Sequence, residues 1–248
     1  MSKNSTVIVT LVIGLIIGYI IGVNYQGQST GDNDTGDGSQ EGMQEFSLGN
    51  HIQLGLPEQD VFIEDESNTS MVLRVEGEQS AENLAKELFA TSETTPHDPF
   101  KIGEDPLGPF PKGEALDFTL EEWLAGSGSG TYTTEGETGT ITLAFETLIP
   151  EGVYTVWCSR LTFPPDVAIV DSPCGAPDGS ENTFTADSAG SASITMTGAA
   201  LTESSEETAT VIALAYHSDG LTYGEEPGEF GNLAHVQLAY IMPPPEQE

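Results

Sequence analysis

Apolar and polar residues alternate with a period of two along most of the second half of the chain, which is the pattern of strands that bury one face. Ile141, Leu143 and Phe145 occupy every second position of "GTITLAF". The same alternation continues in "GVYTVWC", "SASITMT", "ATVIALAYH" and "AHVQLAYIM", and "TYTTEGETGT" predicts a hairpin. Successive strands without intervening helices are typical of antiparallel folds. We therefore predict a mainly β protein in which residues 127–243 form the strands of an antiparallel β-sandwich.

Residues 50–126 show a different pattern, which mixes short strands such as "MVLRV" with two helical segments. In "SAENLAKELFA" the apolar residues recur at helical spacing behind Ser80, which is a suitable N-cap. We expect this part of the chain to form a small helical elaboration on the N-terminal side of the sandwich.

The second helical segment, "FTLEEWLAG", carries the strongest local signals in the chain. Thr119 and Glu122 form a capping box, and Phe118 and Trp123 are placed for a hydrophobic staple. Gly126 is suited to end the helix. We interpret the "GSGSG" that begins at Gly126 as a linker between this helix and the strands.

An uncharged apolar run from Thr6 to Val23 is just long enough to cross a membrane as a helix. Lys3 precedes the run and the first charge after it is Asp32, so the positive-inside rule places residues 1–5 in the cytoplasm and the C-terminal domain outside the cell. A cleavable signal peptide is the alternative, but no A-x-A site follows the run. We predict a single-pass transmembrane signal-anchor in the cell membrane.

Gly14, Gly18 and Gly22 recur at every fourth position of this run. On a helix they leave one face without side chains, which lets a second helix approach closely. This spacing predicts a homo-oligomer formed through the membrane helix.

Residues 24–49 contain mainly Gly, Asp, Ser, Gln and Asn, so they bury too little apolar surface to offset the entropy of ordering. We expect a flexible acidic stalk here. It would hold an extracellular domain, residues 50–243, above the membrane, with residues 244–248 as a short tail. The "DNDTGDG" within the stalk departs from the spacing of a calcium loop, which favours an acidic linker.

The chain is strongly acidic: Asp and Glu number 40 against 6 Lys and Arg, which gives a formal net charge of -34. This charge repels nucleic acid and anionic lipid, so no nucleic-acid partner is expected, and cations and basic proteins are left open as partners. A lysine-poor acidic surface is also typical of proteins in salty media, where counterions screen the self-repulsion. We therefore expect a halophilic protein.

Both cysteines, Cys158 and Cys174, lie in the part predicted to be exported. An even number of cysteines in an oxidising compartment predicts a disulfide. Closing a loop of this length stabilises a fold by roughly 3 kcal/mol in the chain-entropy model. Metal binding by one pair so far apart is the weaker interpretation.

Motifs of the common catalytic mechanisms are absent from the sequence. The chain has no P-loop, no dinucleotide-binding glycine motif, no H-E-x-x-H and no C-x-x-C. The central position of "GSGSG" is Gly128, so this stretch is not a nucleophile elbow. These absences favour a non-enzymatic protein, although so many carboxylates leave a pair for glycoside hydrolysis open.

Histidine supplies the candidate site. His217 ends one predicted strand and His235 begins another, so they share a face at the base of a long loop if the strands pair as a hairpin. The two imidazoles could then bind Cu or Zn with Asp219, and His97 could supply a third nitrogen. The alternative, which we favour, is that both histidines hydrogen-bond the loop and brace it, with no metal or other cofactor and no catalytic role.

The stretches "GVYTVWCSRLTFPPDVAIVDSPCGAPDGSENTFTAD" and "AYHSDGLTYGEEPGEFGNLAHVQL" resemble a group of uncharacterised exported prokaryotic proteins with no assigned activity, over residues 94–243. The resemblance implies export and a β domain and supplies no catalytic residues. Together with the anchor and the charge, it leads us to expect a membrane-anchored, acidic extracellular binding or structural module of unknown ligand. The alternative is a metal-binding protein or enzyme that uses the loop between His217 and His235.

Overall fold

The computed structural model describes residues 43–56, 58–75, 77, 80–98 and 107–244. The predicted membrane anchor with its glycine repeat, residues 24–42 of the predicted stalk, and most of the C-terminal tail lie outside the described residues. Within the described ranges, no helix is long and apolar enough to cross a membrane.

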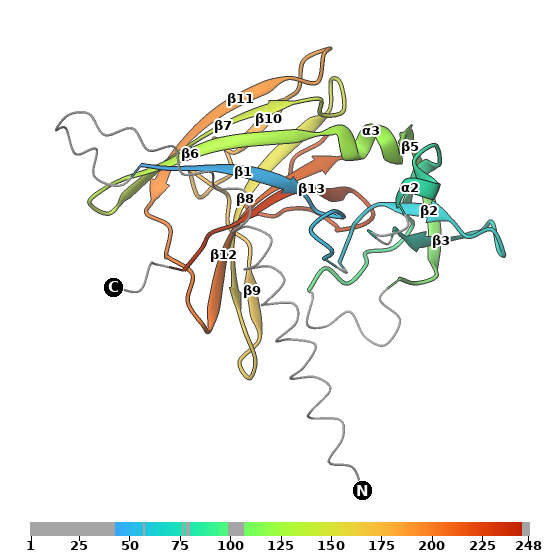
Figure 1. The fold of residues 1–248 in the computed structure, drawn as a ribbon, viewed down its shortest axis with the longest axis horizontal. Coiled ribbons are helices and arrows are strands. Elements are labelled where there is room, and N and C mark those ends of the chain that lie inside the picture. The colour runs from blue at the N-terminus through green and yellow to red at the C-terminus, as the bar shows by residue number, and fades with distance from the viewer. Residues whose placement is uncertain (1–42, 57, 76, 78–79, 99–106, 245–248) are drawn as a thin grey trace, which may run out of the picture. The chain divides into compact units, whose positions relative to one another are not determined.

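The described chain is mainly β, as predicted, and consists of a large antiparallel sheet and a small four-stranded barrel. The large sheet curls into a half-barrel (Figure 1), where the sequence led us to expect two stacked sheets of a sandwich. Its strand order is β10-β8-β12-β13-β1-β6-β7-β11, with β9 paired to β8. The strands are β1 (Gln44–Asn50), β6 (Ser127–Glu135), β7 (Thr138–Glu146), β8 (Val153–Thr162), β9 (Ala168–Val170), β10 (Thr183–Thr185), β11 (Ala192–Ala199), β12 (Thr208–His217) and β13 (Ala234–Ile241).

Strand β1 joins the two halves of the large sheet. Its residues from Gln44 to Leu48 pair with β6, while Gly49 and Asn50 pair with β13. The prediction that the stalk extends to Gly49 is therefore wrong for the last residues of that range. Phe46 and Leu48 are buried, so this segment has the alternating apolar face of a strand despite its polar neighbours.

After Gly126, which caps α3, the "GSGSG" stretch lies in strand β6, and our interpretation of it as a linker is wrong. Glycine is required here because the neighbouring strands place large side chains over it. A Cβ at Gly130 would lie 2.5 Å from Leu143 Cδ2, and a Cβ at Gly128 would lie 2.8 Å from Phe145 Cδ1. Glycine in a strand interior commonly marks such a close approach.

The main core fills the concave side of the curled sheet. Phe46, Leu143, Tyr154 and Leu214 come from four different strands and are all buried in it. The rings of Phe145 and Tyr154 stack on Phe184 with centroids 5.2 and 5.5 Å away. Because each fully buried side chain of this size contributes about 1.5–3 kcal/mol, this cluster is the main source of stability.

The small barrel contains β2 (Phe62–Glu64), β3 (Met71–Arg74), β4 (Glu87–Thr91) and β5 (Phe110–Thr119). The helix predicted for "SAENLAKELFA" is confirmed only for its first turn, α2 (Ser80–Asn83). The rest is wrong, since Leu88, Phe89 and Ala90 are all buried in β4, which pairs with β2 and β5. Pairing between distant segments here overrides helical periodicity.

Helix α3 (Leu120–Ala125) forms as predicted, with the capping box present in full and the rings of Phe118 and Trp123 stacked. The Trp123 carbonyl accepts hydrogen bonds from the side-chain amides of Asn50 (3.3 Å) and Gln237 (2.8 Å). These buried bonds satisfy a helix-end carbonyl and fix α3 against the large sheet.

The predicted disulfide between Cys158 and Cys174 is present. It links β8 to the segment that follows β9, beside the isolated bridge between Trp157 and Pro173. Cys174 is buried against the main core, so the bond holds this segment to the sheet.

Candidate ligand-binding cleft

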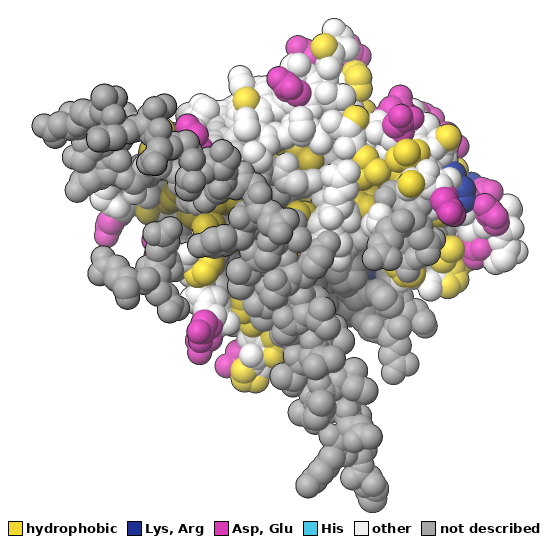
Figure 2. Space-filling model, in the orientation of Figure 1, with side chains coloured by type: hydrophobic (Ala, Val, Ile, Leu, Met, Phe, Trp, Pro, Cys, Tyr) yellow, Lys and Arg dark blue, Asp and Glu magenta, His cyan; other side chains and the backbone are white. Residues whose placement is uncertain are grey.

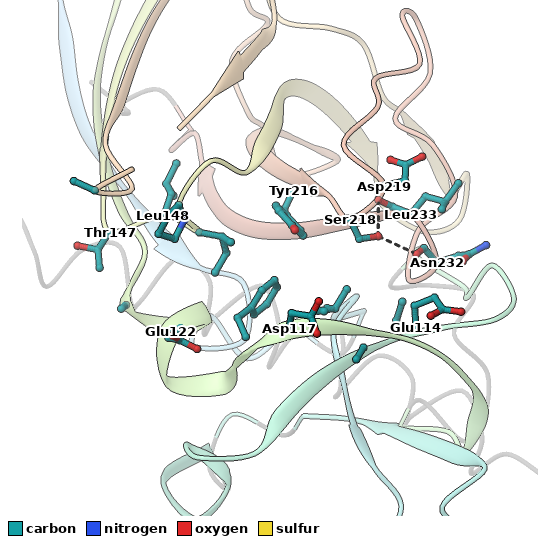
Figure 3. A pocket seen from close by; sticks show the side chains of 18 residues that line it. Glu114, Asp117, Glu122, Thr147, Leu148, Tyr216, Ser218, Asp219, Asn232 and Leu233 are labelled. Carbon is teal, nitrogen blue, oxygen red and sulfur yellow. Dashed lines mark hydrogen bonds between the residues drawn. The ribbon is translucent and has the colours of Figure 1, made fainter. Parts of the chain in front are cut away.

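A cleft of about 710 Å³ opens where β5 and α3 of the small barrel face the end of β12 and the loop before β13. Figure 3 shows Tyr216 and Asp117 pointing toward one another from its two walls. The β12–β13 loop contributes Ser218 and Asp219 at one end, and the β7–β8 connection closes the other end with Leu148. A volume in this range suits a small-molecule ligand.

Asp117 reaches the cleft because strand β5 bulges at this point. Glu87 pairs with Thr119 but Phe89 pairs with Ala115, so β5 holds extra residues between the two pairs. Asp117 takes a φ of 60°, in the left-handed region that asparagine and aspartate tolerate better than most residues. Bulges of this kind redirect side chains next to functional sites.

Tyr216 forms the aromatic floor of the cleft. Its ring makes edge contacts with Phe118 at 5.5 Å and Trp123 at 6.1 Å, which hold it in place. Burial, together with the negative charge of Asp117, raises the pKa of Tyr216, so the hydroxyl stays neutral near pH 7. Its hydroxyl has no hydrogen-bond partner among the described residues and is available to a ligand.

Four carboxylates line the cleft, and none of its described lining residues is Lys, Arg or His. Glu122 is committed to the N-cap, where it accepts hydrogen bonds from the Thr119 backbone (2.7 Å) and hydroxyl (2.9 Å), which lowers the pKa of Glu122. Asp219 accepts from the Leu221 backbone and the Tyr223 hydroxyl. Glu114 and Asp117 are exposed and have no partner within the described chain. Their charges therefore face the cleft uncompensated.

The structure does not bring His217 and His235 together. In the β12–β13 register His217 lies opposite Ala234, and His235 lies opposite Tyr216. Directly paired residues share a face, so this one-residue offset puts the two imidazoles on opposite faces of the sheet. The prediction that they share a face is wrong, and with it the geometry that we had considered for a shared Cu or Zn site.

His217 is buried in the outer face of the sheet. The Trp157 indole donates to Thr155 Oγ1 (2.7 Å), and the same hydroxyl is hydrogen-bonded to His217 Nε2 (2.7 Å). His217 Nδ1 is buried without a hydrogen-bond partner. Burial lowers the pKa of His217 to about 4, despite the opposing charge of Asp219.

His235 and His97 meet at a residue that the sequence did not indicate, Asp60. His235 Nδ1 donates to the Asp60 carbonyl (2.6 Å), and the Ser218 hydroxyl lies 3.1 Å from His235 Nε2. The Asp60 carboxylate pairs with His97 Nδ1 (3.0 Å) and accepts from the Val236 backbone (3.1 Å). His235 thus ties the first residue of the loop to the buried Asp60 segment, as the bracing interpretation predicts for this residue. For His217 the interpretation is wrong, because its imidazole hydrogen-bonds Thr155 of β8 and not the loop.

Charge in this buried network is balanced by His97. Burial acts to raise the pKa of Asp60, but His97, together with His51 and the hydrogen bond from the Val236 backbone, outweighs it, so the pKa of Asp60 is lowered. Burial likewise acts to lower the pKa of His97, but Asp60, together with Glu58 and Asp171, outweighs it, so the pKa of His97 is raised. His97 also stacks on Phe230 of the loop, with ring centroids 3.7 Å apart. Two histidines therefore hold the loop in place from the Asp60 side.

Of the predicted site residues, only Asp219 lines the cleft. Within the part of the chain that the structure describes, no three His, Cys, Asp or Glu side chains are grouped as metal ligands. Asp117 and Tyr216 were missed by sequence reasoning. The sequence feature that could have indicated Asp117 is a carboxylate within the alternating stretch "ALDFT". The same pattern is typical of the exposed face of an ordinary strand, so it did not identify a site.

Comparison with known proteins finds no family model that matches the chain and no curated protein with significant similarity to it.

Proposed function

We propose that this protein is a binding module whose cleft between β5, α3 and the β12–β13 loop takes an organic cation with an apolar body. The observation that carries the proposal is the lining of the cleft: four carboxylates, no basic side chain, and the ring of Tyr216 between them. An ammonium group gains from uncompensated carboxylates and from the face of an aromatic ring, and an apolar body gains from Leu148 and Phe118. Under this proposal the run from Thr6 to Val23 holds the module on the outer face of the cell membrane.

Charge on the whole chain does not by itself define this site. With a net charge of -34, any cation is attracted to the surface, so weak binding that is spread over the molecule is expected for every amine. The cleft differs because Glu114 and Asp117, which have no partner within the described chain, line it together with the neutral hydroxyl of Tyr216. Binding there should depend on Asp117, whereas diffuse binding should not.

Calorimetric titration of the full chain with benzylamine, and with benzyl alcohol as a neutral analogue, tests the proposal. Benzylamine should bind with one site and benzyl alcohol should not. Asp117→Asn should weaken benzylamine binding about fivefold or more, the equivalent of roughly 1 kcal/mol for a partly exposed ion pair. Asp166→Asn, which removes an exposed carboxylate from the β8–β9 turn, is the matched control and should bind as wild type does. Equal losses in the two variants would show diffuse attraction and reject the cleft.

A further inference from the structure

A second surface lies on the outward face of the large sheet, across β6, β7 and β11. Thr142 stands at its centre, paired with Thr131 on one side and Thr195 on the other. The hydroxyls of Thr142 and Thr195 are 3.2 Å apart. The alternate residues of the same strands, such as Leu143, point into the main core, so these threonines all face outward.

The same pattern continues on both sides of this row. Thr140 and Thr197 form a second hydroxyl pair at 3.2 Å, with Thr133 beside them. Ser129, Ala144 and Ser193 form the third row. Neighbouring strands lie about 4.8 Å apart and alternate residues along a strand roughly 6.8 Å apart, so the hydroxyls form a regular two-dimensional grid. We call this grid the hydroxyl face.

The hydroxyl face carries no charge, although the chain as a whole has a net charge of -34. Carboxylates lie at its borders, with Glu45 on β1 opposite Thr131 and Glu135 and Glu146 at strand ends. In Figure 2 the uncovered surface over β6 and β7 is mainly white, and the magenta carboxylates lie toward its margins. A cationic partner finds no charge to pair with on the face itself and is drawn to the carboxylates around it, and an anionic partner is repelled by the molecule as a whole.

We propose that the hydroxyl face is a docking surface for a neutral, insoluble polysaccharide. The outward face of the curled sheet lacks the concave shape of a small-molecule site, so its partner is an extended polymer. Each threonine hydroxyl both donates and accepts, which matches the hydroxyls of a sugar polymer. Single bonds of this kind contribute only about 0.5–1.5 kcal/mol net, but a regular grid repeats them against a repeating partner.

A second copy of the chain fits this face less well. Serine is depleted at protein–protein interfaces, whose cores are rich in aromatic residues and Met, and the grid presents neither. Two chains of charge -34 also repel one another as they approach, even where the contact itself is neutral. A neutral polymer has no such penalty.

Cosedimentation of the full chain with microcrystalline cellulose and with chitin particles tests the proposal, in about 1 M NaCl, where charges are screened beyond about 3 Å. Wild type should sediment with at least one of them. Thr142→Glu and Thr142→Lys should each lower the bound fraction about tenfold, because binding would have to remove water from the introduced charge, which costs free energy. Thr222→Glu and Thr222→Lys place the same charges on an exposed loop outside the face and should bind as wild type does.

Three results would overturn the proposal. The first is no sedimentation of wild type with either polysaccharide. The second is wild-type binding by the Thr142 variants, once thermal unfolding has shown that they fold. The third is a wild-type dimer in sedimentation velocity that Thr142→Glu dissociates, which would assign the face to a second copy.

Discussion

At the scale of single residues, buried histidine sets how this protein responds to acid. His217 is 1% exposed and keeps its ring neutral, with Nε2 hydrogen-bonded to the Thr155 hydroxyl. His97 has the opposite environment, because the Asp60 carboxylate stabilises its charged form. Two histidines on neighbouring elements therefore shift stability with pH in opposite directions.

The free energy of unfolding should fall as the pH is lowered from 6.5 to about 4, because of His217. Burial lowers the pKa of His217 from 6.5 to about 4, so in this window the unfolded chain binds a proton that the folded chain refuses. The stability that depends on the neutral His217 ring is fully present above pH 6.5. On the order of 3 kcal/mol of it is lost by pH 4. His217→Gln, whose amide can still hydrogen-bond Thr155, should flatten the measured slope of denaturant-derived stability against pH.

His97→Gln is the control for the sign. Because the pKa of His97 is higher in the folded chain than in the unfolded chain, this histidine adds stability that is complete at pH values below its unfolded-state pKa. That stability is lost as the pH rises through its folded-state pKa. Removing it should abolish this loss of stability above pH 6.5, which is where the two variants are compared, because below pH 6.5 His97→Gln also deprives Asp60 of a partner that lowers its pKa. A His217→Gln protein with the wild-type slope would show that this imidazole is not the group that titrates.

At the scale of elements, the close packing of β6 against β1 and β7 decides which residues the strand accepts. Strand interiors ordinarily favour β-branched residues over glycine. In β6, however, the side chains of Phe46 and Leu143 cover the inward positions, and both are buried in the core. Glycine therefore fits this strand because of its neighbours rather than its own preference.

Gly130→Ala should destabilise the protein, although alanine is the better strand residue by propensity. The new Cβ would lie 2.5 Å from Leu143 Cδ2 and 2.8 Å from Phe46 Cζ, and overpacking of this kind costs about 1–3 kcal/mol. Ser129→Ala, at the adjacent exposed position, should change stability by less than about 0.5 kcal/mol. Chemical denaturation of both variants measures the difference. A Gly130→Ala protein as stable as Ser129→Ala would mean that β6 does not lie this close to its neighbours.

At the scale of the whole molecule, the carboxylates repel one another over the entire surface. Because Asp and Glu outnumber Lys and Arg by 40 to 6, few of them find an ion-pair partner. The pairs within the described chain, such as Lys112 with Glu64 and Lys86 with Glu66, offset little of this charge. Folding brings the charges closer together, so screening by salt favours the folded state.

Thermal stability should rise steeply with NaCl, since the Debye length falls from about 30 Å at 0.01 M to about 3 Å at 1 M. Salt can also strengthen apolar burial, so the comparison needs a variant with less charge. Changing exposed glutamates to glutamine should give a shallower rise in melting temperature, measured by calorimetry. Suitable positions are Glu135, Glu137, Glu206, Glu207 and Glu225. The same salt response in both proteins would refute the electrostatic explanation.

Local patterns in the sequence by themselves predicted the elements that depend on residues close to one another in the chain. The alternation in "GTITLAF" identified β7, because one buried face imposes a period of two on a strand. The stretch "ATVIALAYH" identified β12 through its apolar run, since this strand is buried on both faces. The capping box at Thr119 identified α3, since all of its hydrogen bonds lie within one turn. The disulfide followed from the number of cysteines, and the acidic surface followed from composition.

Only the tertiary structure decided the features that depend on pairing between distant segments. Residues 87–91 became a strand because β2 and β5 pair with them, and β6 takes glycine because of side chains on two other strands. The register of β12 with β13 separated His217 from His235, and the bulge in β5 directed Asp117 at Tyr216. Register and bulges are set by how well the whole face of one strand packs against its neighbours. A shift of one residue moves every side chain to the opposite face, so a short window of sequence does not predict the register.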